Sequence, residues 1–450
     1  MNMLLTIALI AAAISGGCDY ADNPGAESPS APSSQTLVDP LQLSSLKGLQ
    51  PGDTVLVADG KYSDVKLTFS ARGTAESPVV FRAQTPGGVH FTGESSAKIK
   101  GEGVVVEGFV WDGIINQSTD IISFDKAAAH CVLRNCKIDG TGSADGTVDG
   151  ISNKWVSLKG LENEVSDCSF FDKRNMGTLL VVWLDGVTVP RHKILRNSFT
   201  RPFTIYDAGG KAANGQETIR VGDSRTSMTD AGCIVSDNYF ERCDGELAEI
   251  ISNKSCANLY EHNYFYRSAG SLTLRHGNNC TVRGNFFAAD GVETSGGVRI
   301  IGEGHRVEGN VIIGSTGSAY NSAICIVRGE SDAALNGYWT VKNATVTGNA
   351  IIAPKVGISV NYSGRSTQDS APEGVVVSGN TIVVDAAKSV SVYEFGDLDD
   401  SNVRYEDNII YGGRQRDVHT KLAQVSSRPD VQSYETEREA IKANAGVKWE

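Results

Sequence analysis

The sequence lacks the marks of a membrane-spanning or nucleic-acid-binding protein. The apolar run at residues 4–14 is too short to span a bilayer, and no other segment is long and apolar enough to do so. The 41 lysines and arginines are outnumbered by 53 aspartates and glutamates, which gives a formal net charge of −12. This charge argues against a nucleic acid as partner. An anionic ligand could then bind only where basic side chains gather locally.

Zinc-site patterns and aromatic residues are also scarce. No CxxC pair and no Cys/His group has the spacing of zinc ligands. Aromatic residues make up 7% of the chain, whereas glycine occurs 49 times. This composition is typical of short strands joined by many tight turns.

Short apolar strands recur along most of the chain, each around a small or polar residue. Their spacing runs from 22 to 41 residues, which fits one coil with or without a loop insertion. Val, Ile and Phe content and alternation favour strands over helices. We therefore predict an all-β fold, a right-handed parallel β-helix with an Asn ladder between coils; the alternative is a chain of β-sandwiches with coincidental Asn. The central residues are Asn135, Asp167, Asn197, Asn238, Asn263, Asn285, Asn310, Asn349, Asn380 and Asn408.

The two ends differ from this repeat. Residues 1–17 resemble a signal peptide, and the small residues before Cys18 resemble a lipobox with lipidation at that cysteine. A Ser/Pro-rich linker (18–36) follows. We predict the β-helix over 37–412 and a polar, partly helical cap over 413–450. The protein is expected to be exported, either as a periplasmic or cell-surface lipoprotein of a bacterium or in secreted form.

Eight cysteines remain after Cys18, an even number that permits disulfides in an exported protein. Most of them lie within the strand patterns at coil-like spacing. Thiols that face inward would stack in the core, so we predict that most are buried and free.

One stretch of the repeat combines acidic, basic and imidazole side chains. Glu246 and Glu249 could hold a hard cation, Lys254 could accept a proton, and Arg275 and His276 could steady an anion. Lys254 and Arg275 are 21 positions apart, close to one coil, so they should lie side by side. This pattern predicts an enzyme that acts on an anionic polymer. A basic groove is expected from residues on neighbouring coils, about half of which should be ordinary solvated residues: Lys254, Arg267, Arg275, Arg283, Arg299 and Arg306.

Several motifs resemble polysaccharide lyase family 6, which comprises alginate lyases and chondroitinase B-type dermatan lyases. The resemblance covers roughly residues 37–412, and its family fold is the parallel β-helix. The motifs occur in the family's order: PGDTVLVADGKYSDVKLTF (51–69), GTAESPVVFRAQTPGGVHFTGESS (73–96), NGQETIRVG (214–222), CDGELAEIISNKS (243–255), LTLRHGN (272–278) and GGVRIIGEGH (296–305).

The resemblance implies roles for individual residues. Lys254 matches the catalytic base and Arg275 its partner, often assigned as the acid. His276 and Arg299 match positions that contact substrate. Arg220, Arg267 and His305 are predicted as further substrate-binding residues.

The resemblance also implies a calcium site, formed by Asn214, Glu246 and Glu249. The family has two Glu two positions apart, whereas this chain has Leu247 and Ala248 between them. On a regular strand the two carboxylates would face opposite sides. A β-bulge at Leu247 or Ala248 would restore the pair. Otherwise the calcium site would be incomplete and another cation or a water network would take its place.

β-Elimination explains these residue types. The base removes the C5 proton of a 4-linked uronate and the 4-oxygen leaves. A cation or Arg cluster on the carboxylate stabilises the enolate-like dianion that develops. Arg275 beside a partly desolvated Lys254 would favour the neutral amine that a base requires.

Three alternatives remain beside an alginate lyase. Dermatan sulfate is the second candidate substrate, although no dense Arg cluster for sulfate stands out. A glycoside hydrolase would need several Asp on adjacent coils, and residues 243–280 contain only Asp244. A non-catalytic glycan-binding solenoid would keep the basic groove without needing Lys254. Specificity for mannuronate or guluronate and endo or exo action depend on loops such as 207–231, 328–340 and 362–373.

Overall fold

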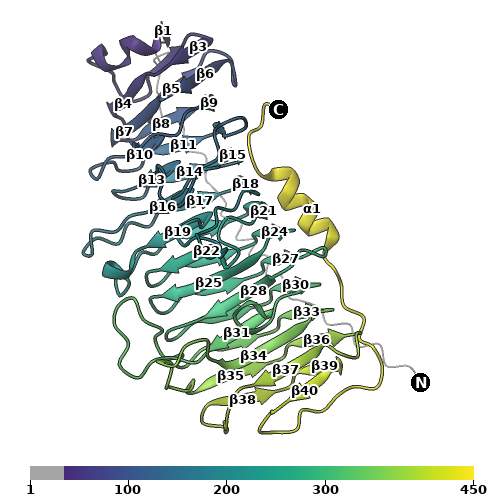
Figure 1. Cartoon of the computed structure of the whole chain (residues 1–450). Coiled ribbons are helices and arrows are strands. Elements are labelled where there is room, and N and C mark those ends of the chain that lie inside the picture. The colour runs from purple at the N-terminus through teal and green to yellow at the C-terminus, as the bar shows by residue number, and fades with distance from the viewer. Residues whose placement is uncertain (1–34) are drawn as a thin grey trace, which may run out of the picture. The chain divides into compact units, whose positions relative to one another are not determined.

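A computed structural model describes residues 35–450, and these residues form a parallel β-helix. The predicted signal peptide, the candidate lipidation site Cys18 and almost all of the linker lie outside the described residues. Every strand pair is parallel, and apart from the first pair, β1 and β2, successive strands of each sheet are three apart in the chain (Figure 1). Each coil therefore contributes one strand to each of three sheets, and the predicted all-β solenoid is confirmed.

The first sheet has 14 short strands. In spatial order they are β1 (Gln35–Val38), β2 (Thr54–Val57), β5 (Val79–Ala83), β8 (Val104–Glu107), β11 (Val132–Arg134), β14 (Glu164–Ser166), β17 (Lys193–Leu195), β20 (Ile234–Ser236), β23 (Leu259–Glu261), β26 (Thr281–Arg283), β29 (Arg306–Glu308), β32 (Thr345–Thr347), β35 (Val375–Ser378) and β38 (Val403–Glu406).

The second sheet, called here the groove sheet, has 13 strands. They are β4 (Lys66–Arg72), β7 (Ser96–Glu102), β10 (Ile122–Phe124), β13 (Val156–Leu158), β16 (Leu180–Val182), β19 (Ile219–Gly222), β22 (Glu249–Lys254), β25 (Gly270–His276), β28 (Ser295–Ile300), β31 (Ile324–Val327), β34 (Val356–Tyr362), β37 (Val390–Glu394) and β40 (Arg414–Arg416).

The third sheet also has 13 strands. They are β3 (Gly60–Ser63), β6 (Val89–Gly93), β9 (Phe109–Ile114), β12 (Lys137–Asp139), β15 (Ser169–Phe171), β18 (Ser198–Arg201), β21 (Tyr239–Cys243), β24 (Tyr264–Tyr266), β27 (Phe286–Ala288), β30 (Val311–Ile313), β33 (Ala350–Ile352), β36 (Thr381–Val384) and β39 (Ile409–Gly412).

Alike side chains stack along the interior of the coils. Five phenylalanines of the third sheet have successive ring centroids 4.5 to 5.1 Å apart, close to the spacing of neighbouring strands: Phe170, Phe199, Phe240, Phe265 and Phe287. All eight cysteines of the described residues are buried and free, as predicted. The core is one continuous column, because each coil places the same kind of residue above the last.

The Asn ladder is confirmed for eight of the ten predicted positions, from Asn197 to Asn408. At each step a side-chain amide donates to the next Asn side-chain oxygen, for example Asn263 Nδ2 to Asn285 Oδ1 at 2.9 Å. The same amide also donates to a backbone carbonyl, as Asn263 does to Val235. Both of these amide hydrogens are therefore satisfied inside the turn, where an unpaired polar group would be costly.

Asn135 and Asp167 do not belong to the ladder, and their prediction is wrong. Both precede the ladder position and have left-handed backbone, with φ of 52° each. The ladder position itself is taken by Cys136 and Cys168, and the Cys168 amide donates to Asn197 Oδ1 at 3.0 Å. The residue before each ladder Asn is Asp, Gly, His or Arg at positive φ. Asn135 and Asp167 match by residue type because Asn and Asp also tolerate this left-handed conformation.

Helices are few. Three 3-10 segments lie between strands, η1 (Pro40–Ser45), η2 (Ser224–Thr226) and η3 (Ala319–Asn321), and one α-helix, α1 (Glu435–Asn444), lies near the C-terminus. No helix of the described residues is long and apolar enough to cross a membrane.

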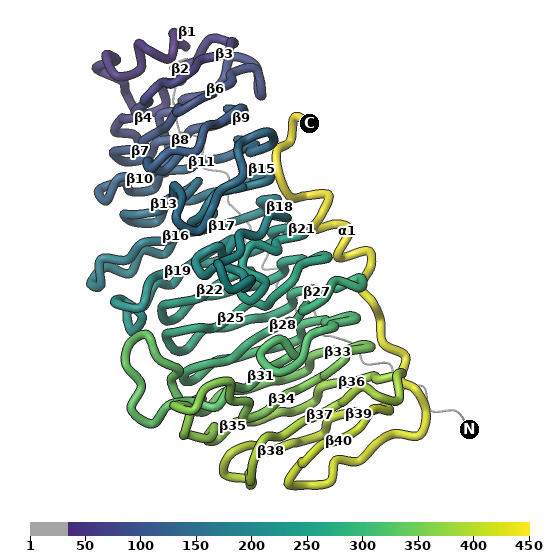
Figure 2. Tube along the Cα trace, viewed as in Figure 1, coloured from purple at the N-terminus to yellow at the C-terminus, as the bar shows by residue number. Residues whose placement is uncertain are grey.

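The C-terminal segment differs from the predicted cap. The β-helix extends past residue 412 into β40, and the helix does not cover the last coil. Figure 2 shows the segment running back along the flank of the solenoid. Tyr434 and Ile441 pack there against the third sheet, and Lys448 N donates to Asn135 Oδ1 at 2.8 Å. The C-terminal segment thus contacts coils that are formed by the first half of the chain.

Candidate active site

Lys254 ends β22 and points out of the groove sheet. Its backbone pairs with His276 of β25, after a register shift that makes Arg275 the additional residue of a bulge. The Lys254 side chain is 18% exposed, and its Nζ lies 3.8 Å from Glu217 Oε1. Gly222 of β19 permits this approach of the coils, because a Cβ there would lie 2.3 Å from the Lys254 carbonyl oxygen.

Arg275 is fixed by a loop that follows β31, two coils further along the chain. Its Nη1 donates to the Gly337 carbonyl at 2.8 Å and its Nη2 to the Asn336 carbonyl at 3.1 Å. The guanidinium also lies over the Tyr338 ring, 4.1 Å from its centroid. These contacts orient the cation toward the pocket that Lys254 also lines.

His276 is a neutral imidazole. Burial, then the charges of Arg275 and Lys254, lower its pKa to about 3. Arg275 Nη1 lies 2.8 Å from His276 Nε2, and since the guanidinium is always a donor, Nε2 accepts. The imidazole proton therefore resides on Nδ1, which lies 3.4 Å from Ser224 Oγ.

Two predicted cation ligands approach the same pocket from different local structures. Glu249 is the first residue of β22, whereas Glu246 lies in the preceding turn. Leu247 adopts left-handed backbone with φ of 56° in that turn. Together with Asn214, both carboxylates line the pocket. Leu247 and Ala248 thus lie in a turn and form no bulge, while the register of β22 shifts one step later, where Ile250 is the additional residue against β25.

A third carboxylate, Glu217, belongs to this cluster and was missed from the sequence. It lies just before β19, one coil before Lys254, and is almost fully buried. Its Oε2 accepts from Thr178 Oγ1 at 2.8 Å. Burial, then repulsion by Glu217 and Glu249, raises the pKa of Glu246 to about 8. Glu246 Oε2 also accepts from the amides of Gly215 at 2.9 Å and Gln216 at 3.2 Å. The signal for Glu217 was its place three residues after Asn214 in the motif NGQETIRVG.

The cluster has oxygen donors that suit a hard cation, but in residues 35–450 no three His, Cys, Asp or Glu side chains are already grouped as metal ligands. Cationic side chains stand beside two of the carboxylates instead. Lys254 faces Glu217, and Arg299 Nη1 lies 3.7 Å from Glu249 Oε1. A bound cation would therefore compete with these two side chains for the carboxylates.

Arg299 of β28 is the third basic residue of the pocket. Only 6% of its side chain is exposed. Its Nη2 donates to Asn321 Oδ1 at 2.6 Å and its Nε to the Tyr320 carbonyl at 3.1 Å. The loop that contains η3 therefore fixes Arg299 much as the 336–338 loop fixes Arg275.

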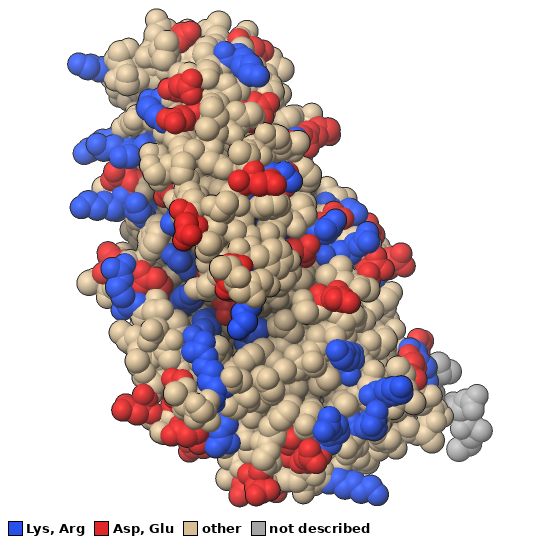
Figure 3. Space-filling model, viewed as in Figure 1, with Lys and Arg blue, Asp and Glu red and all other residues tan. Residues whose placement is uncertain are grey.

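The structure thus gathers seven predicted residues around a cavity of about 860 Å³ (Figure 3, where blue and red side chains meet at the hollow). Loop residues that the sequence did not single out complete the lining, because nothing in their local sequence marks them: Ser224, Ala248, Ser318, Ala319, Tyr320, Asn321, Asn336, Tyr338 and Arg365. The predicted residues that line the cavity are Asn214, Glu246, Glu249, Lys254, Arg275, His276 and Arg299.

Other predicted substrate-binding residues lie elsewhere. His305 is fully buried in a bend, where its Nδ1 accepts from the Cys280 amide at 3.2 Å and its Nε2 lies 3.0 Å from the Ile301 carbonyl. It cannot touch a polymer in the groove, so this prediction is wrong. Arg267 does not line the cavity and lies 3.5 Å from Asp290. Arg220 lies on the groove sheet one coil from Lys254, outside the cavity lining.

The predicted basic groove is correspondingly smaller than the sequence suggested. Arg283 and Arg306 are on the first sheet, where they pair with Glu261 and Glu308. As expected, half of the six basic residues are outside the pocket.

Comparison with known proteins assigns the fold and its family. A profile described as Chondroitinase B matches residues 40–445. The chain belongs to the chondroitinase B family, within polysaccharide lyase family 6. No protein of curated function matches the sequence significantly.

Solved structures of other family 6 members superpose on this protein over most of the length of its chain. The alginate lyase AlyGC is 29% identical with a TM-score of 0.78 over 93% of this chain, which spans 57% of AlyGC. A mannuronic acid-specific family 6 lyase from human gut microbiota is 26% identical, with a TM-score of 0.78 over 92% of this chain and 96% of its own. The family 6 lyase Pedsa3628 from Pseudopedobacter saltans is 24% identical, with a TM-score of 0.69 over 92% of this chain and 99% of its own, and shares the fold.

Proposed function

We propose that this protein is a polysaccharide lyase that cleaves a 4-linked uronate polymer, most favourably alginate, by β-elimination. One observation carries the proposal. Lys254, Arg275 and the neutral His276 line a single cavity together with Arg299 and an acidic cluster. An anionic sugar placed there would contact the base Lys254 and the fixed guanidinium groups of Arg275 and Arg299. Among the described residues, the cavity lining contains no pair of Asp residues of the kind that a glycoside hydrolase uses.

Lys254 is the proposed base. As the C5–H bond breaks, Lys254 Nζ takes the proton and the electron pair forms the C4–C5 double bond. The C4–O bond breaks, and the departing oxygen receives a proton from the site, for which Arg275 is the expected donor or charge partner. The product is one unsaturated uronate end and one new hydroxyl end.

Arg275 and Arg299 are positioned before substrate arrives. Backbone carbonyls and aromatic rings hold both guanidinium groups, so little reorganisation is needed when negative charge builds up on the uronate carboxylate. The unprotonated Nε2 of His276 accepts from Arg275, and this contact keeps the imidazole from adding a charge of its own.

We further propose that calcium binds at Asn214, Glu217, Glu246 and Glu249. When bound, it would supply a Lewis acid for the substrate carboxylate. Two observations support this calcium site. The side chains offer oxygen donors, and the raised pKa of Glu246 shows that the carboxylates repel one another, which a cation would relieve. Glu217 Oε1 lies 3.8 Å from Lys254 Nζ, so a cation that drew this carboxylate away would leave the Lys254 side chain free to meet the substrate.

Alginate is favoured over dermatan sulfate on two grounds. Solved relatives more than 25% identical are described as an alginate lyase and a mannuronic acid-specific lyase. In addition, Arg275 and Arg299 are already engaged by loop carbonyls and acidic groups, which leaves Arg365 as the exposed arginine of the cavity for a sulfate. Dermatan sulfate is the second candidate because the family profile itself is that of chondroitinase B.

Export is part of the same proposal, since long uronate polymers are met outside the cell. It rests on the apolar run at residues 4–14 and the lipobox-like residues before Cys18. Cell fractionation of the wild type and of Cys18→Ala tests it; a lipidated protein leaves the membrane fraction when Cys18 is replaced.

Ultraviolet absorbance on separate polymannuronate, polyguluronate and dermatan sulfate tests the reaction. Elimination creates a conjugated unsaturated uronate that absorbs, whereas hydrolysis does not. Binding without any absorbance change would instead favour the non-catalytic glycan-binding solenoid.

A further inference from the structure

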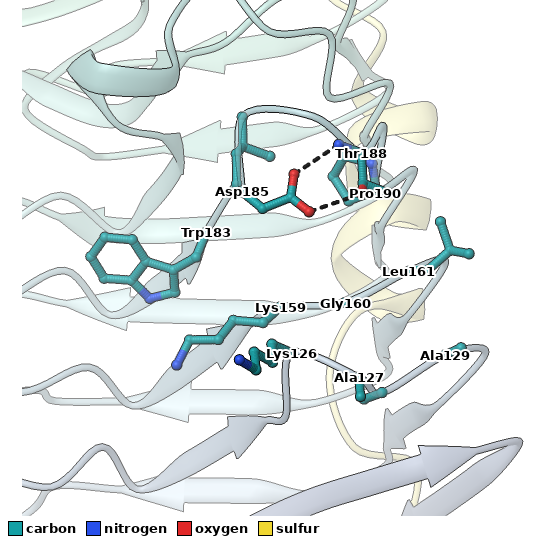
Figure 4. Close-up of a pocket in the computed structure, with 12 residues that line it drawn as sticks. Lys126, Ala127, Ala129, Lys159, Gly160, Leu161, Trp183, Asp185, Thr188 and Pro190 are labelled. Atoms are coloured by element: carbon teal, nitrogen blue, oxygen red, sulfur yellow. Dashed lines mark hydrogen bonds between the residues drawn. The ribbon is translucent and has the colours of Figure 1, made fainter.

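A second hollow lies on the groove sheet, several coils before the cavity of Lys254. It has a volume of about 480 Å³, and residues that follow β10, β13 and β16 line it (Figure 4). Its polar side chains include Lys126, Lys159, Trp183 and Asp185. None of these residues was singled out by the sequence motifs or used in the proposed mechanism.

The ammonium groups of Lys126 and Lys159 in this hollow have no protein partner within residues 35–450. Neither of them makes a hydrogen bond or an ion pair with a protein group of that part of the chain. Figure 4 shows the Lys159 side chain extending toward the side of the hollow where the Trp183 indole lies, with Lys126 beside it. Lysines without an ion pair are common on the coils of the described residues, Lys193 among them, so what distinguishes this pair is that both line one hollow. Two unpaired ammonium groups beside one hollow suit an anionic ligand.

Trp183 gives this hollow a fixed apolar platform. Its Nε1 donates to Ser157 Oγ at 3.2 Å, which sets the orientation of the ring. Arg220 lies over the indole at 5.0 Å and Lys154 at 5.9 Å from the centroid. A partly buried indole flanked by cations fits a sugar ring that bears a carboxylate, because the ring offers an apolar edge and the cations offer charge.

The one acidic residue of the hollow is occupied within its own turn. Asp185 accepts from the amides of Val187 and Thr188 at 2.8 and 2.7 Å, and from Thr188 Oγ1 at 2.8 Å. Its carboxylate therefore stabilises the turn, and the two lysines outnumber it. The hollow keeps a net positive charge on a protein whose net charge is −12.

The hollow and the cavity lie in line along the groove sheet. Lys159 follows β13, and β13 pairs with β16, β16 with β19 and β19 with β22, which ends at Lys254. Three strand spacings correspond to roughly 14 Å. Between them β19 ends in Gly222, which has no side chain to obstruct a polymer, and Arg220 bridges toward Trp183. Figure 3 shows basic side chains recurring along this flank.

The opposite end of the cavity is walled. Residues 318–321 and 336–338 line it there, and Arg365 lies over Tyr338 at 4.8 Å. A long substrate seated at Lys254 therefore has its open path toward the early coils, where Trp183 and Lys159 lie.

We propose that Lys126, Lys159 and Trp183 form a distal binding site for a second stretch of the same uronate polymer whose scissile residue lies at Lys254. This proposal rests on the proposed function for its ligand class, an acidic polysaccharide. The site anchors long chains and leaves the chemical step unchanged.

The test compares Lys126→Ala/Lys159→Ala with the wild type on a long alginate and on an alginate trisaccharide. Lys193→Ala is the matched control, since this exposed lysine is on the first sheet and likewise has no ion pair within residues 35–450. We expect KM for the long polymer to rise about three- to ten-fold with kcat unchanged, as two surface charge contacts are lost. The difference should shrink at high salt. KM and kcat for the trisaccharide should not change, because it is too short to reach both sites.

A second arm is independent of catalysis. Retardation in alginate-containing native gels is compared for Lys254→Ala alone and with both distal substitutions added. Weaker retardation of the combined variant supports the distal site. Equal retardation, or an equal loss of trisaccharide turnover in the first arm, overturns it. If the wild type cleaves no uronate polymer, the proposed function fails, while the gels still decide the distal site.

Discussion

Lys254 Nζ lies 3.8 Å from Glu217 Oε1, although 37 positions separate them and each comes from a different coil. The expected base and an acidic residue of the cation cluster are thus direct neighbours. Any change in the charge of one is felt by the other, because both side chains are largely removed from solvent.

The first prediction concerns Glu217→Gln. The amide keeps the hydrogen-bonding shape toward Thr178 but removes one charge from the cluster. We expect a lower calcium affinity, so that half-maximal activity needs at least several-fold more calcium, while the melting temperature in chelator does not fall. Calcium titration of lyase activity measures this. An unchanged calcium requirement would remove Glu217 from the cation site.

Replacement of the proposed base should abolish turnover. Lys254→Ala should lose roughly 10²–10⁴-fold in kcat, the usual contribution of a positioned general base. The fold should persist, since the side chain projects from the sheet rather than into the core. Ultraviolet absorbance and thermal melting together measure both, with Lys193→Ala as control. Activity above about a tenth of wild type would reject Lys254 as the base.

Arg275 should behave differently when replaced conservatively. Arg275→Lys keeps the charge but cannot donate to both the Gly337 and Asn336 carbonyls while stacking on Tyr338. We expect a loss of kcat close to that of Arg275→Ala. Near wild-type kcat in the lysine variant would show that charge alone is required.

Cation removal should change stability with a defined pH dependence. The pKa of Glu246 rises from about 4.5 to about 8 on folding without a cation. The folded state then holds an extra proton between these values, so the free energy of unfolding in EGTA should fall as pH rises from about 4.5 to 8. Calcium should reverse the fall, and Glu246→Gln should flatten it. Chemical denaturation across this range measures the slope. A wild-type slope equal to that of Glu246→Gln, with full activity in EGTA, would exclude the calcium site.

His305 and His276 offer a contrast between structure and chemistry. His305→Ala removes an acceptor for the Cys280 amide inside the coil and leaves a cavity, so we expect a lower melting temperature by several degrees. The KM of the folded fraction should not change. His276→Ala should instead lower kcat by freeing Arg275. A raised KM in stable His305→Ala protein would restore His305 as a substrate contact.

Local sequence determined the architecture of this protein. Strand patterning, glycine turns and the recurrent Asn specify a stack of parallel coils, because each coil repeats the same turn chemistry and buries the same kinds of residue. It also placed Lys254, Arg275 and His276 on adjacent coils, since one coil is close to the 21 positions between the first two. The single-position error at Asn135 and Asp167 arose because left-handed turn residues and ladder residues draw on the same side chains.

Tertiary structure alone decided which charged residues meet. Loop lengths differ from coil to coil, so no spacing in the sequence predicts that Asn336 and Gly337 hold Arg275 or that Tyr320 and Asn321 hold Arg299. The turn at Leu247 and the register shift after Glu249 bring Glu246 and Glu249 to one cavity despite an extra residue, a result that regular strand periodicity does not predict. The hollow lined by Lys159 and Trp183 lies in line with the cavity of Lys254 only because stacked coils align residues that are far apart in the chain.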